Sequence, residues 1–396
     1  MKVYADNAAT TALSQKALES LQYHYKNTYG NPSGLYEMAQ VAKEVLENAR
    51  ETIAKCLGCT EREIYFTSCG SESDNQAIFS TAMLGAKKNK KHIVSSKFEH
   101  HAVLHTLQNL QREFGFEVTY LDVYENGMVR PEDLEQAIRP DTCLVTIMYA
   151  NNEIGTIQPI EALASIAKKH GVYFHTDAVQ AVGHLPINLA ESNIDMLSFS
   201  AHKFHGPKGV GALYVRKGAP LRPYIFGGAQ ENNKRAGTEN VPQIAAMAVA
   251  LEEAVGNMQA HNAKMQELRD YIQAELLKIS HSKVNGQEDS RLAGILNMCF
   301  EGVEGEGMLL YLDDMGVCVS SGSACTSGSL DPSHVLMAMG LPHDIAHGSL
   351  RISLSALTTK EEAEHIVACV PQVINKIRQM SPVWKDLEEG VRKHVI

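Results

Sequence analysis

Residues 64–72 read Ile-Tyr-Phe-Thr-Ser-Cys-Gly-Ser-Glu, and this stretch predicts how the chain is built. The β-branched and aromatic residues 64–67 favour a short strand, and the small residues after them lead into a helical pattern that reaches Gly85. Such a turn directs backbone N–H groups and the Ser71 hydroxyl at one spot in front of a helix N-terminus, which suits a phosphate. An ordinary helix cap with Glu72 in the first turn explains the same residues equally well.

The alternation of strands and helices continues on both sides of this stretch. Apolar residues recur at three- and four-residue steps from 35 to 57, which predicts one amphipathic helix followed by Gly58. Further strands are predicted at residues 93–95, 116–121, 143–149, 172–176, 196–199 and 210–215. Apolar strands separated by helices predict an α/β fold with a mainly parallel sheet covered on both faces, and ligands of such sheets bind beyond the carboxyl ends of the strands.

The pattern changes after Gly237. Residues 241–280 predict one long helical stretch with Pro242 near its first turn. Strands near residues 295–300 and 350–354 and helices near 305–312 and 360–380 follow it. We therefore predict a large domain over residues 15–255, and a smaller α/β domain that joins residues 1–14 to residues 256–396.

Composition narrows the function classes. The chain has 396 residues, 44% of them hydrophobic and 21% charged, as in ordinary globular proteins. Its net charge of −10 disfavours direct nucleic-acid binding. The eight cysteines are too sparse for a disulfide scaffold, so we expect free thiols in the reducing cytoplasm. No signal peptide and no long apolar run are visible, so we expect no membrane association. The Cys56/Cys59 pair lacks the second pair that a zinc site needs, so we expect no metal site there.

Two polar segments follow predicted strands. Asp177, in His-Thr-Asp-Ala-Val-Gln (175–180), ends an apolar strand, where a carboxylate needs a partner; it is either functional or part of a helix cap or structural ion pair. Lys203 lies in Ser-Phe-Ser-Ala-His-Lys-Phe-His-Gly-Pro-Lys-Gly (198–209), between a strand and a Gly-Pro turn. Partial burial there would lower the pKa of its amine and make it a usable nucleophile.

A third segment carries a thiol. Residues 320–329 read Ser-Ser-Gly-Ser-Ala-Cys-Thr-Ser-Gly-Ser, and such small residues cannot pack a core. Cysteine is most often a buried apolar residue, but this setting favours a reactive role for Cys325. Together the segments fit pyridoxal phosphate (PLP): Lys203 would hold it as a Schiff base, Asp177 would keep its ring nitrogen protonated, and residues 67–72 would hold its phosphate. A transaminase does not need a reactive cysteine, so Cys325 indicates a different reaction.

A series of short motifs gives these residues a family context. They occur in order at residues 6–11 (Asp-Asn-Ala-Ala-Thr-Thr), 30–33 (Gly-Asn-Pro-Ser), 71–75, 99–100, 151–155 (Asn-Asn-Glu-Ile-Gly), 176–180, 200–203, 235–238 (Arg-Ala-Gly-Thr) and 320–325. The series resembles the signature of NifS/IscS-type cysteine desulfurases, class V members of the PLP enzymes of fold type I, from about residue 3 to residue 375. The long run around Cys325 resembles the NifS-like branch with an extended cysteine loop.

The resemblance implies a seven-stranded sheet in the large domain and a role for each matching residue. Its implied catalytic residues are Cys325, Lys203 and His100, where His100 would stack on the cofactor ring. The implied cofactor-binding residues are Lys203, Ser71, His100, Asn152, Asp177, Gln180, Ser200, His202 and Thr238, the last from the neighbouring subunit of a homodimer. The implied substrate-binding residues are Arg351, Asn31 and Asn152. One departure is visible, since Asn232 stands where the family usually has arginine.

The function that the resemblance implies is conversion of L-cysteine to L-alanine with a persulfide on Cys325. The sulfur would pass to an iron–sulfur scaffold protein of the NifU/IscU type or to another acceptor. Alternatives are a selenocysteine lyase, another class V aminotransferase, and a non-catalytic sulfur-relay protein without cofactor. Retention of Lys203, Asp177 and Cys325 counts against the last of these.

Overall fold

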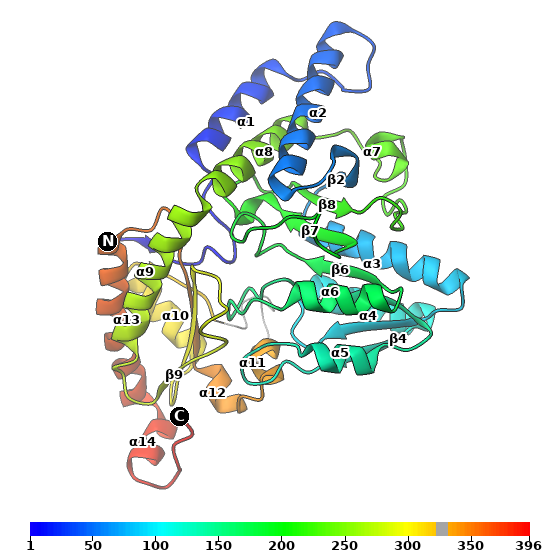
Figure 1. The fold of residues 1–396 in the computed structure, drawn as a ribbon. Helices are drawn as coiled ribbons and strands as arrows, with labels where there is room; N and C mark the ends of the chain where they lie inside the picture. Colours follow the sequence, from blue (N-terminus) through cyan, green and yellow to red (C-terminus); the bar gives the residue numbers. More distant parts are fainter. Residues whose placement is uncertain (322–331) are drawn as a thin grey trace.

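The structure, a computed structural model, describes residues 1–321 and 332–396. Its larger part contains a seven-stranded sheet in the order β2-β8-β7-β6-β5-β3-β4 (Figure 1). The strands are β2 (Ile64–Thr67), β3 (His92–Ser96), β4 (Glu117–Leu121), β5 (Thr142–Thr146), β6 (Tyr173–Asp177), β7 (Met196–Ser200) and β8 (Gly211–Val215). Only β8 runs antiparallel to its neighbours in this sheet. The predicted α/β fold with a mainly parallel sheet is confirmed.

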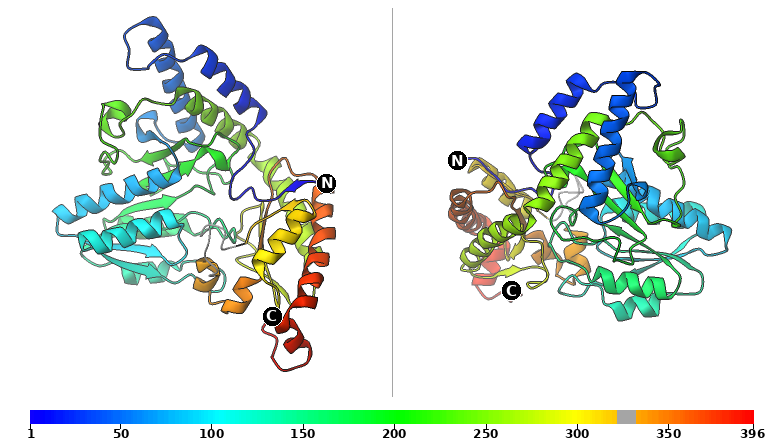
Figure 2. Two further views of the ribbon diagram at one scale, coloured as in Figure 1. Left: turned by 180° about the vertical axis from the view of Figure 1, so that it is seen from behind. Right: turned by 45° about the horizontal axis from the view of Figure 1, so that its top comes forward.

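Helices cover both faces of this sheet. Helices α5 (Pro131–Ala137) and α6 (Ile160–Lys169) lie on one face, and α3 (Gly70–Lys87) and α4 (His101–Phe114) lie on the other (Figures 1 and 2). Every residue of β3, β5, β7 and β8 is buried. This two-sided burial explains why these strands are continuous apolar runs rather than alternating patterns.

The helices around the sheet follow the sequence signals in most places. Helix α1 (Gln15–Asn27) precedes α2 (Glu37–Leu57), which ends as predicted at Gly58, where φ is +65°. The prediction of one helix over residues 241–280 is wrong, because α8 (Val241–Gly256) and α9 (Met258–Leu276) are separate. Asn257 leaves helical geometry, and its backbone N–H and side-chain amide both donate to the Glu253 carbonyl. Asparagine competes for backbone partners in this way, which the apolar pattern does not reveal.

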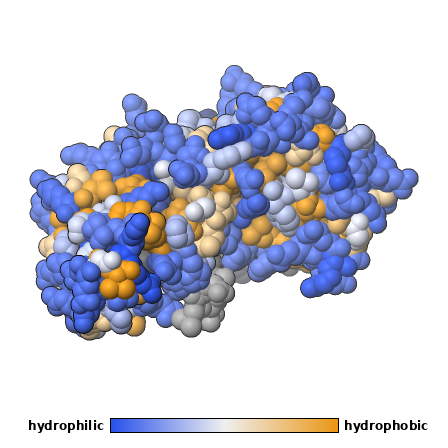
Figure 3. Space-filling view, turned by 90° about the horizontal axis from the view of Figure 1, so that it is seen from below, coloured by the Kyte–Doolittle hydropathy of each residue, from blue (hydrophilic) through white to orange (hydrophobic). Residues whose placement is uncertain are grey.

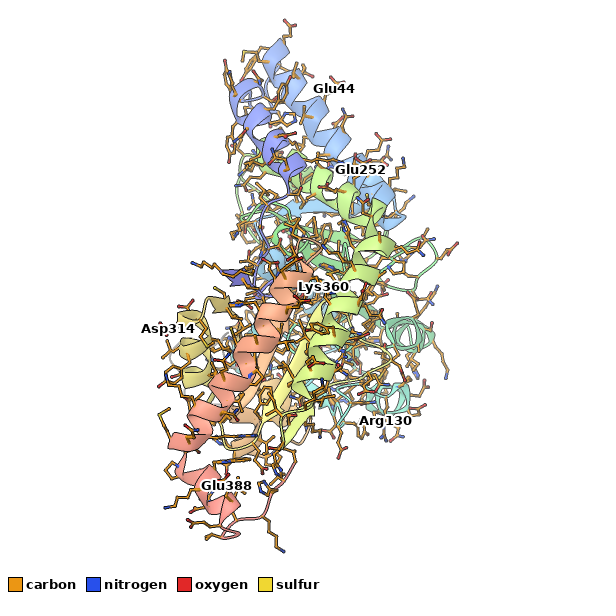
Figure 4. The ribbon with its side chains drawn as sticks, turned by 90° about the vertical axis from the view of Figure 1, so that its left-hand side faces the viewer. Glu44, Arg130, Glu252, Asp314, Lys360 and Glu388 are labelled. Atoms are coloured by element: carbon orange, nitrogen blue, oxygen red, sulfur yellow. The ribbon has the colours of Figure 1, made fainter. Side chains whose placement is uncertain are left out.

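The smaller part has an antiparallel sheet in the order β12-β10-β9, formed by β9 (Ser282–Val284), β10 (Ile295–Phe300) and β12 (Ser349–Ser353). Helices α9 and α13 (Lys360–Met380) lie side by side against it (Figure 4). Strand β1 (Val3–Tyr4) pairs with β11 (Val317–Cys318), so the N-terminal residues reach this part. The remaining described helices are α7 (Gln230–Asn233), α10 (Gly305–Asp314), α11 (His334–Ala338), α12 (His343–His347) and α14 (Pro382–Glu388).

None of the helices in the described part of the chain is both long and apolar enough to cross a bilayer. Seen from below, the molecule is predominantly hydrophilic, and apolar residues gather in separate patches (Figure 3).

Candidate active site

A cavity of about 430 Å³ lies where β6 and β7 end, as expected for an open α/β sheet. Residues from both parts of the molecule line it, because Asp6 and Arg351 face strand ends of the large sheet. The predicted site residues that line the cavity are Ser71, His100, Asn152, Asp177, Gln180, Ser200, His202, Lys203 and Arg351. Residues far apart in the sequence therefore meet at one point.

Lys203 follows β7 in a short turn of 3₁₀ helix, Ala201–Lys203. Its Nζ donates to the carbonyl oxygens of Ala8, at 2.6 Å, and Ala9, at 2.8 Å. The amine is thus aimed into the cavity by the N-terminal segment. Gln180 supports the same segment, since its side-chain amide donates to Ala8 at 2.9 Å.

Asp177 is buried at the end of β6. Its Oδ1 accepts the Val179 N–H at 2.9 Å, and burial raises its pKa to about 6, while Lys203 acts in the opposite direction. A buried carboxyl at this position is ready to pair with a cationic or protonated ring nitrogen. The helix-cap alternative accounts for one of its oxygens, but not for a position on the cavity wall.

Two further acids lie beneath Asp177. Burial, and then the nearby charge of Asp177, raise the pKa of Asp74 well above its ordinary value. Burial raises the pKa of Glu99 to about 8, although Ser96 and the Met148 N–H donate to it. Burial thus disfavours the charged form of both groups, and Glu99, with a pKa of about 8, is mostly protonated at neutral pH, whereas Asp177, with a pKa of about 6, is mostly charged.

The N-terminus of α3 meets the cavity without a side-chain cap. Its N-cap residue, Cys69, makes no capping hydrogen bond, and Glu72 turns away to accept from Ser68 and Arg235. This arrangement disfavours the ordinary-cap interpretation and leaves backbone N–H groups facing the cavity beside Ser71. A Cβ at Gly70 would lie 2.6 Å from Val179 Cγ2, so the close approach requires glycine.

The same end of the cavity has unsatisfied donors for an anion. The Ser200 hydroxyl is buried and has no hydrogen-bond partner within the described part of the chain. His202 lies beside it on the cavity wall, and burial lowers its pKa to about 4. A phosphate group fits this arrangement, because its oxygens would accept from the Ser200 hydroxyl and from the helix N-terminus.

His100 is the N-cap of α4. Its Nδ1 accepts the Ala102 N–H at 3.1 Å, and burial, followed by the charge of Lys203, lowers its pKa to about 4. The imidazole is therefore neutral at neutral pH, and Nε2 carries the proton. An uncharged planar ring with one defined donor suits both stacking on an aromatic group and proton transfer.

Arg351 lies on β12 and is 3% exposed. One of its terminal nitrogens donates to Asp6 Oδ1 at 2.7 Å, and the other donates to the Asn152 carbonyl at 3.2 Å. Its Nε is buried without a partner among the described residues. Asp6 and Asn152 therefore orient this guanidinium on the cavity wall, and its substrate-binding role stays a prediction.

Two predicted residues do not line this cavity, and a third is not among the residues that the structure describes. Thr238 and Asn31 are exposed and do not line it, and Cys325 lies outside the described residues. Near Thr238, the departure at Asn232 falls in a turn where residues 231–233 all have positive φ. Asparagine tolerates this left-handed backbone better than most residues do, which gives the substitution a local physical reason.

Sequence reasoning did not single out Asp6 and Asp74, which also line the cavity. Both belong to quoted motifs, but neither stands at the end of a recognisable strand. Asp6 is placed by the long-range pairing of its segment with β12, since the Asn7 N–H donates to the Ser353 carbonyl. No local pattern predicts a contact between residues so far apart.

The aminotransferase class-V family matches residues 3–366, so the chain belongs to this family, whose members use PLP. The chain is 50% identical to the cysteine desulfurase IscS of Methanosarcina thermophila over 381 residues. The aligned region covers 96% of this chain and 94% of that protein. A solved NifS-like protein has a TM-score of 0.89 at 39% identity, over 95% of this chain and all of that one (100%). SspA in complex with cysteine has a TM-score of 0.78 at 38% identity, over 90% of this chain and 100% of that chain.

Proposed function

We propose that this protein is a PLP-dependent cysteine desulfurase, which converts L-cysteine to L-alanine and holds the released sulfur as a persulfide on Cys325. The observation that carries the proposal is the meeting of Lys203, Asp177 and Arg351 in one cavity. An amine, a buried carboxylate and a carboxylate-binding guanidinium are what an amino-acid-converting PLP enzyme requires. The relatives named as cysteine desulfurases, and the similar structure that contains cysteine, support this substrate.

The cavity fits the cofactor in chemical terms. Lys203 would hold it covalently, Asp177 would pair with its ring nitrogen, and Ser71, Ser200 and His202 would hold its phosphate. Gln180 and Asn152 complete the polar wall around it. Pyridoxal phosphate, when bound, supplies an electron sink that stabilises negative charge at the substrate α-carbon.

Arg351 would bind the substrate carboxylate. Its guanidinium is already held by Asp6 and by the Asn152 carbonyl, so little side-chain freedom is lost when substrate binds. Each terminal nitrogen has a second N–H beyond the one that Asn152 or Asp6 accepts, and these would donate to the carboxylate oxygens. Asn31 is exposed on this chain, so its proposed contact with substrate depends on a rearrangement or on a second subunit.

Proton movement would involve Lys203 and His100. The Nζ of Lys203, when it is not bonded to the cofactor, would accept the proton from the substrate α-carbon. His100 has its proton on Nε2 and is neutral, so it can donate that proton and recover it from a neighbour. Burial disfavours the protonated, charged form of this imidazole, and the positive charge of Lys203 disfavours it as well.

Sulfur transfer would form one bond and break another. The Cys325 thiolate attacks the substrate sulfur, the substrate carbon–sulfur bond breaks, and the carbon fragment takes up a proton to leave as alanine. Cysteine plus thiol thus gives alanine plus persulfide, with no outside oxidant. Ser320 pairs through its backbone with Arg351, so the segment that leads to Cys325 starts beside the substrate-binding strand.

The proposal is tested by the products. Purified holoenzyme given L-cysteine should release alanine and gain 32 Da, about the mass of one sulfur, on the peptide that contains Cys325. Cys325→Ser should bind PLP normally and form neither product, while Cys56→Ser serves as the matched control that forms both. Full alanine production by Cys325→Ser without added thiol would sink the proposal, and selenide or keto-acid production would favour its rivals.

We further propose that the protein works as a homodimer. Large apolar side chains are exposed on and near the α1–α2 hairpin, at one end of the molecule (Figure 1). They include Tyr29, Leu35 and Tyr36, with Phe226 on the loop before α7. Thr238 is exposed close to that loop, which suits a residue that would complete the phosphate site of a neighbouring subunit.

The final sulfur acceptor and the compartment follow from the same proposal. A persulfide must pass to another thiol, so we propose an iron–sulfur scaffold protein or another thiolated acceptor as partner. The seven described cysteines are all free thiols, which fits the cytoplasm. We also propose that residues 15–255 act as the cofactor-binding domain, and that residues 1–14 with 256–396 act as the domain that carries Cys325.

A further inference from the structure

We propose a zinc-binding site, separate from the active site, formed by His281, Glu301 and His394. In the described part of the chain these three side chains offer ligand atoms that all lie within 4.8 Å of one another. Two imidazoles and one carboxylate are a common zinc ligand set in proteins, and a water molecule completes it. The proposal is independent of the desulfurase function.

The strand pairing brings two of the ligands together. His281 precedes β9 and Glu301 follows β10, and these strands pair antiparallel with Ser282 opposite Phe300. The Glu301 N–H also donates to the His281 carbonyl at 3.0 Å. His281 has a φ of +53°, so its backbone is held in a left-handed conformation that is uncommon outside glycine. Backbone strain of this kind requires support from the surrounding structure.

The C-terminal tail supplies the third ligand. After α14 the chain turns back, so that its end lies beside that helix (Figures 1 and 4). His394 Nδ1 lies 2.8 Å from Glu301 Oε2, and the Val395 N–H donates to the other Glu301 oxygen at 2.8 Å. Glu301 is buried, while each imidazole is about one-third exposed, so solvent and an ion can reach the group.

The distances are close to those of a tetrahedral site. Ligands about 2.0–2.1 Å from zinc lie roughly 3.3 Å from one another. Glu301 Oε2 lies 2.8 Å from His394 Nδ1 and 3.6 Å from His281 Nδ1, on either side of that value. The two rings are stacked at 3.6 Å and 13°, so one of them must turn to aim its lone pair at a shared ion. Their exposure leaves room for that rotation.

A surrounding layer holds the ligands in place. Trp384 packs edge-on against both imidazoles, at 5.7 and 5.8 Å between ring centroids. Arg378 lies over the Trp384 ring and donates to the carbonyls of Glu301 and His281. Such outer contacts fix ligand orientation in metal sites.

Zinc is favoured over other common ions by the donor types. Imidazole nitrogens suit zinc, whereas magnesium and calcium prefer sites made of oxygens. Binding would displace the proton that His394 shares with Glu301, and also the hydrogen bond from His281 Nδ1 to the Ile396 carbonyl. Zinc would therefore fasten the C-terminal tail to the end of β10.

The test is a zinc titration of chelator-treated holoenzyme in the Cys325→Ser background, which removes the reactive thiol as a competing ligand. We expect one zinc per chain by calorimetry, nitrogen and oxygen ligands at about 2.0–2.1 Å by X-ray absorption, and a thermal midpoint raised by zinc. His394→Ala and Glu301→Gln should each weaken binding at least tenfold. His281→Asn should do the same, because asparagine keeps the left-handed backbone.

The matched control is His347→Ala, which disrupts a different histidine pair, His343 and His347 on α12. It should leave the stoichiometry and the affinity unchanged. Unchanged PLP absorbance in every variant shows that the fold is retained. Equal zinc binding by wild type, His394→Ala and Glu301→Gln would overturn the proposal, and so would the absence of binding by wild type, since the three residues would then only form a hydrogen-bonded anchor for the tail.

Discussion

Arg351 is the residue whose environment says most about substrate binding. It is almost fully buried, and each of its terminal nitrogens already has an acceptor, one on Asp6 and one on Asn152. A lysine at this position would place one charge in the cavity but could not hold Asp6, Asn152 and a carboxylate in a single plane.

We therefore expect Arg351→Lys to raise the KM for L-cysteine roughly 10- to 100-fold, in line with about 1.5–3 kcal/mol for a charged hydrogen bond. The PLP absorbance should stay unchanged, because Arg351 would contact substrate rather than cofactor. Arg112→Lys, on the exposed face of α4, is the control and should leave KM unaltered. An unchanged KM in Arg351→Lys would remove this residue from the substrate site.

His175 gives a pH prediction at the same scale. It is fully buried between Thr146 and Ser198, and burial lowers its pKa to about 3. Below the ordinary histidine pKa of about 6.5, the unfolded chain therefore binds a proton that the folded chain does not. This difference makes stability fall as the pH falls from about 6.5.

Buried carboxyls act in the opposite direction in this pH range. Burial raises the pKa of Glu99 to about 8 and that of Glu153 to about 7, so the folded chain keeps protons that the unfolded chain loses. A comparison of wild type with His175→Gln separates the contribution of His175 to the pH dependence of stability from that of the carboxyls. The thermal midpoint of His175→Gln should drop less between pH 7 and pH 5 than that of wild type, with exposed His343→Gln as the control. Parallel pH profiles in wild type and His175→Gln would contradict the assignment.

Among the elements, the strands were the most predictable and their directions the least. The predicted strands 64–67 and 196–199 agree with β2 and β7 to within a residue. A strand that is buried on both faces has a continuous run of apolar residues, which can be recognised in the sequence. The antiparallel direction of β8 depends on a short connection from β7 rather than a crossover helix, and its residues look like those of its parallel neighbours.

In the candidate site, too, local sequence patterns were recognisable and long-range contacts were not. Lys203 and Asp177 were predictable because polar residues at the ends of apolar strands are conspicuous. Asp6 was not, since its role depends on a contact with β12 across most of the chain. The turn at residues 67–72 fitted a phosphate site and an ordinary helix cap equally well in the sequence; the structure turns Glu72 towards Arg235, and phosphate binding by this turn stays a prediction.

The start of α3 makes a prediction for a whole element. Gly70→Ala would push the new Cβ against Val179 and displace the helix N-terminus from the cavity. We expect the Kd for PLP to rise roughly tenfold, as for the loss of one hydrogen bond of about 1–1.5 kcal/mol. The double variant Gly70→Ala/Val179→Ala should recover most of that affinity, because it removes the opposing methyl group. Failure of this rescue would show that the contact with Val179 is not the cause.

For the whole molecule, the exposed apolar end around the α1–α2 hairpin is the feature to test. Leu35 is 97% exposed and Phe226 is 82% exposed, which is unusual for such side chains unless a partner covers them. Leu35→Glu/Phe226→Glu should convert a dimer to a monomer in size-exclusion chromatography with light scattering. PLP affinity should fall as well, because Thr238 could no longer reach a neighbouring site.

The control for this prediction is Leu310→Glu, which places the same charge on an exposed apolar residue of α10. It should leave the dimer intact. A wild-type protein that is monomeric at micromolar concentration would remove the proposed role of Thr238 across the interface.

We expect the ion pair between Asp6 and Arg351 to limit which substrates the cavity binds. Asp6 already balances the guanidinium charge, so the first carboxylate that binds there leaves the local charge negative. An amino acid whose side chain is a second anion, such as a sulfinate or a carboxylate, would meet that negative charge together with the nearby Asp177. A neutral thiol side chain would meet no such repulsion, so we expect Asp6 to favour cysteine over its oxidised and dicarboxylic analogues.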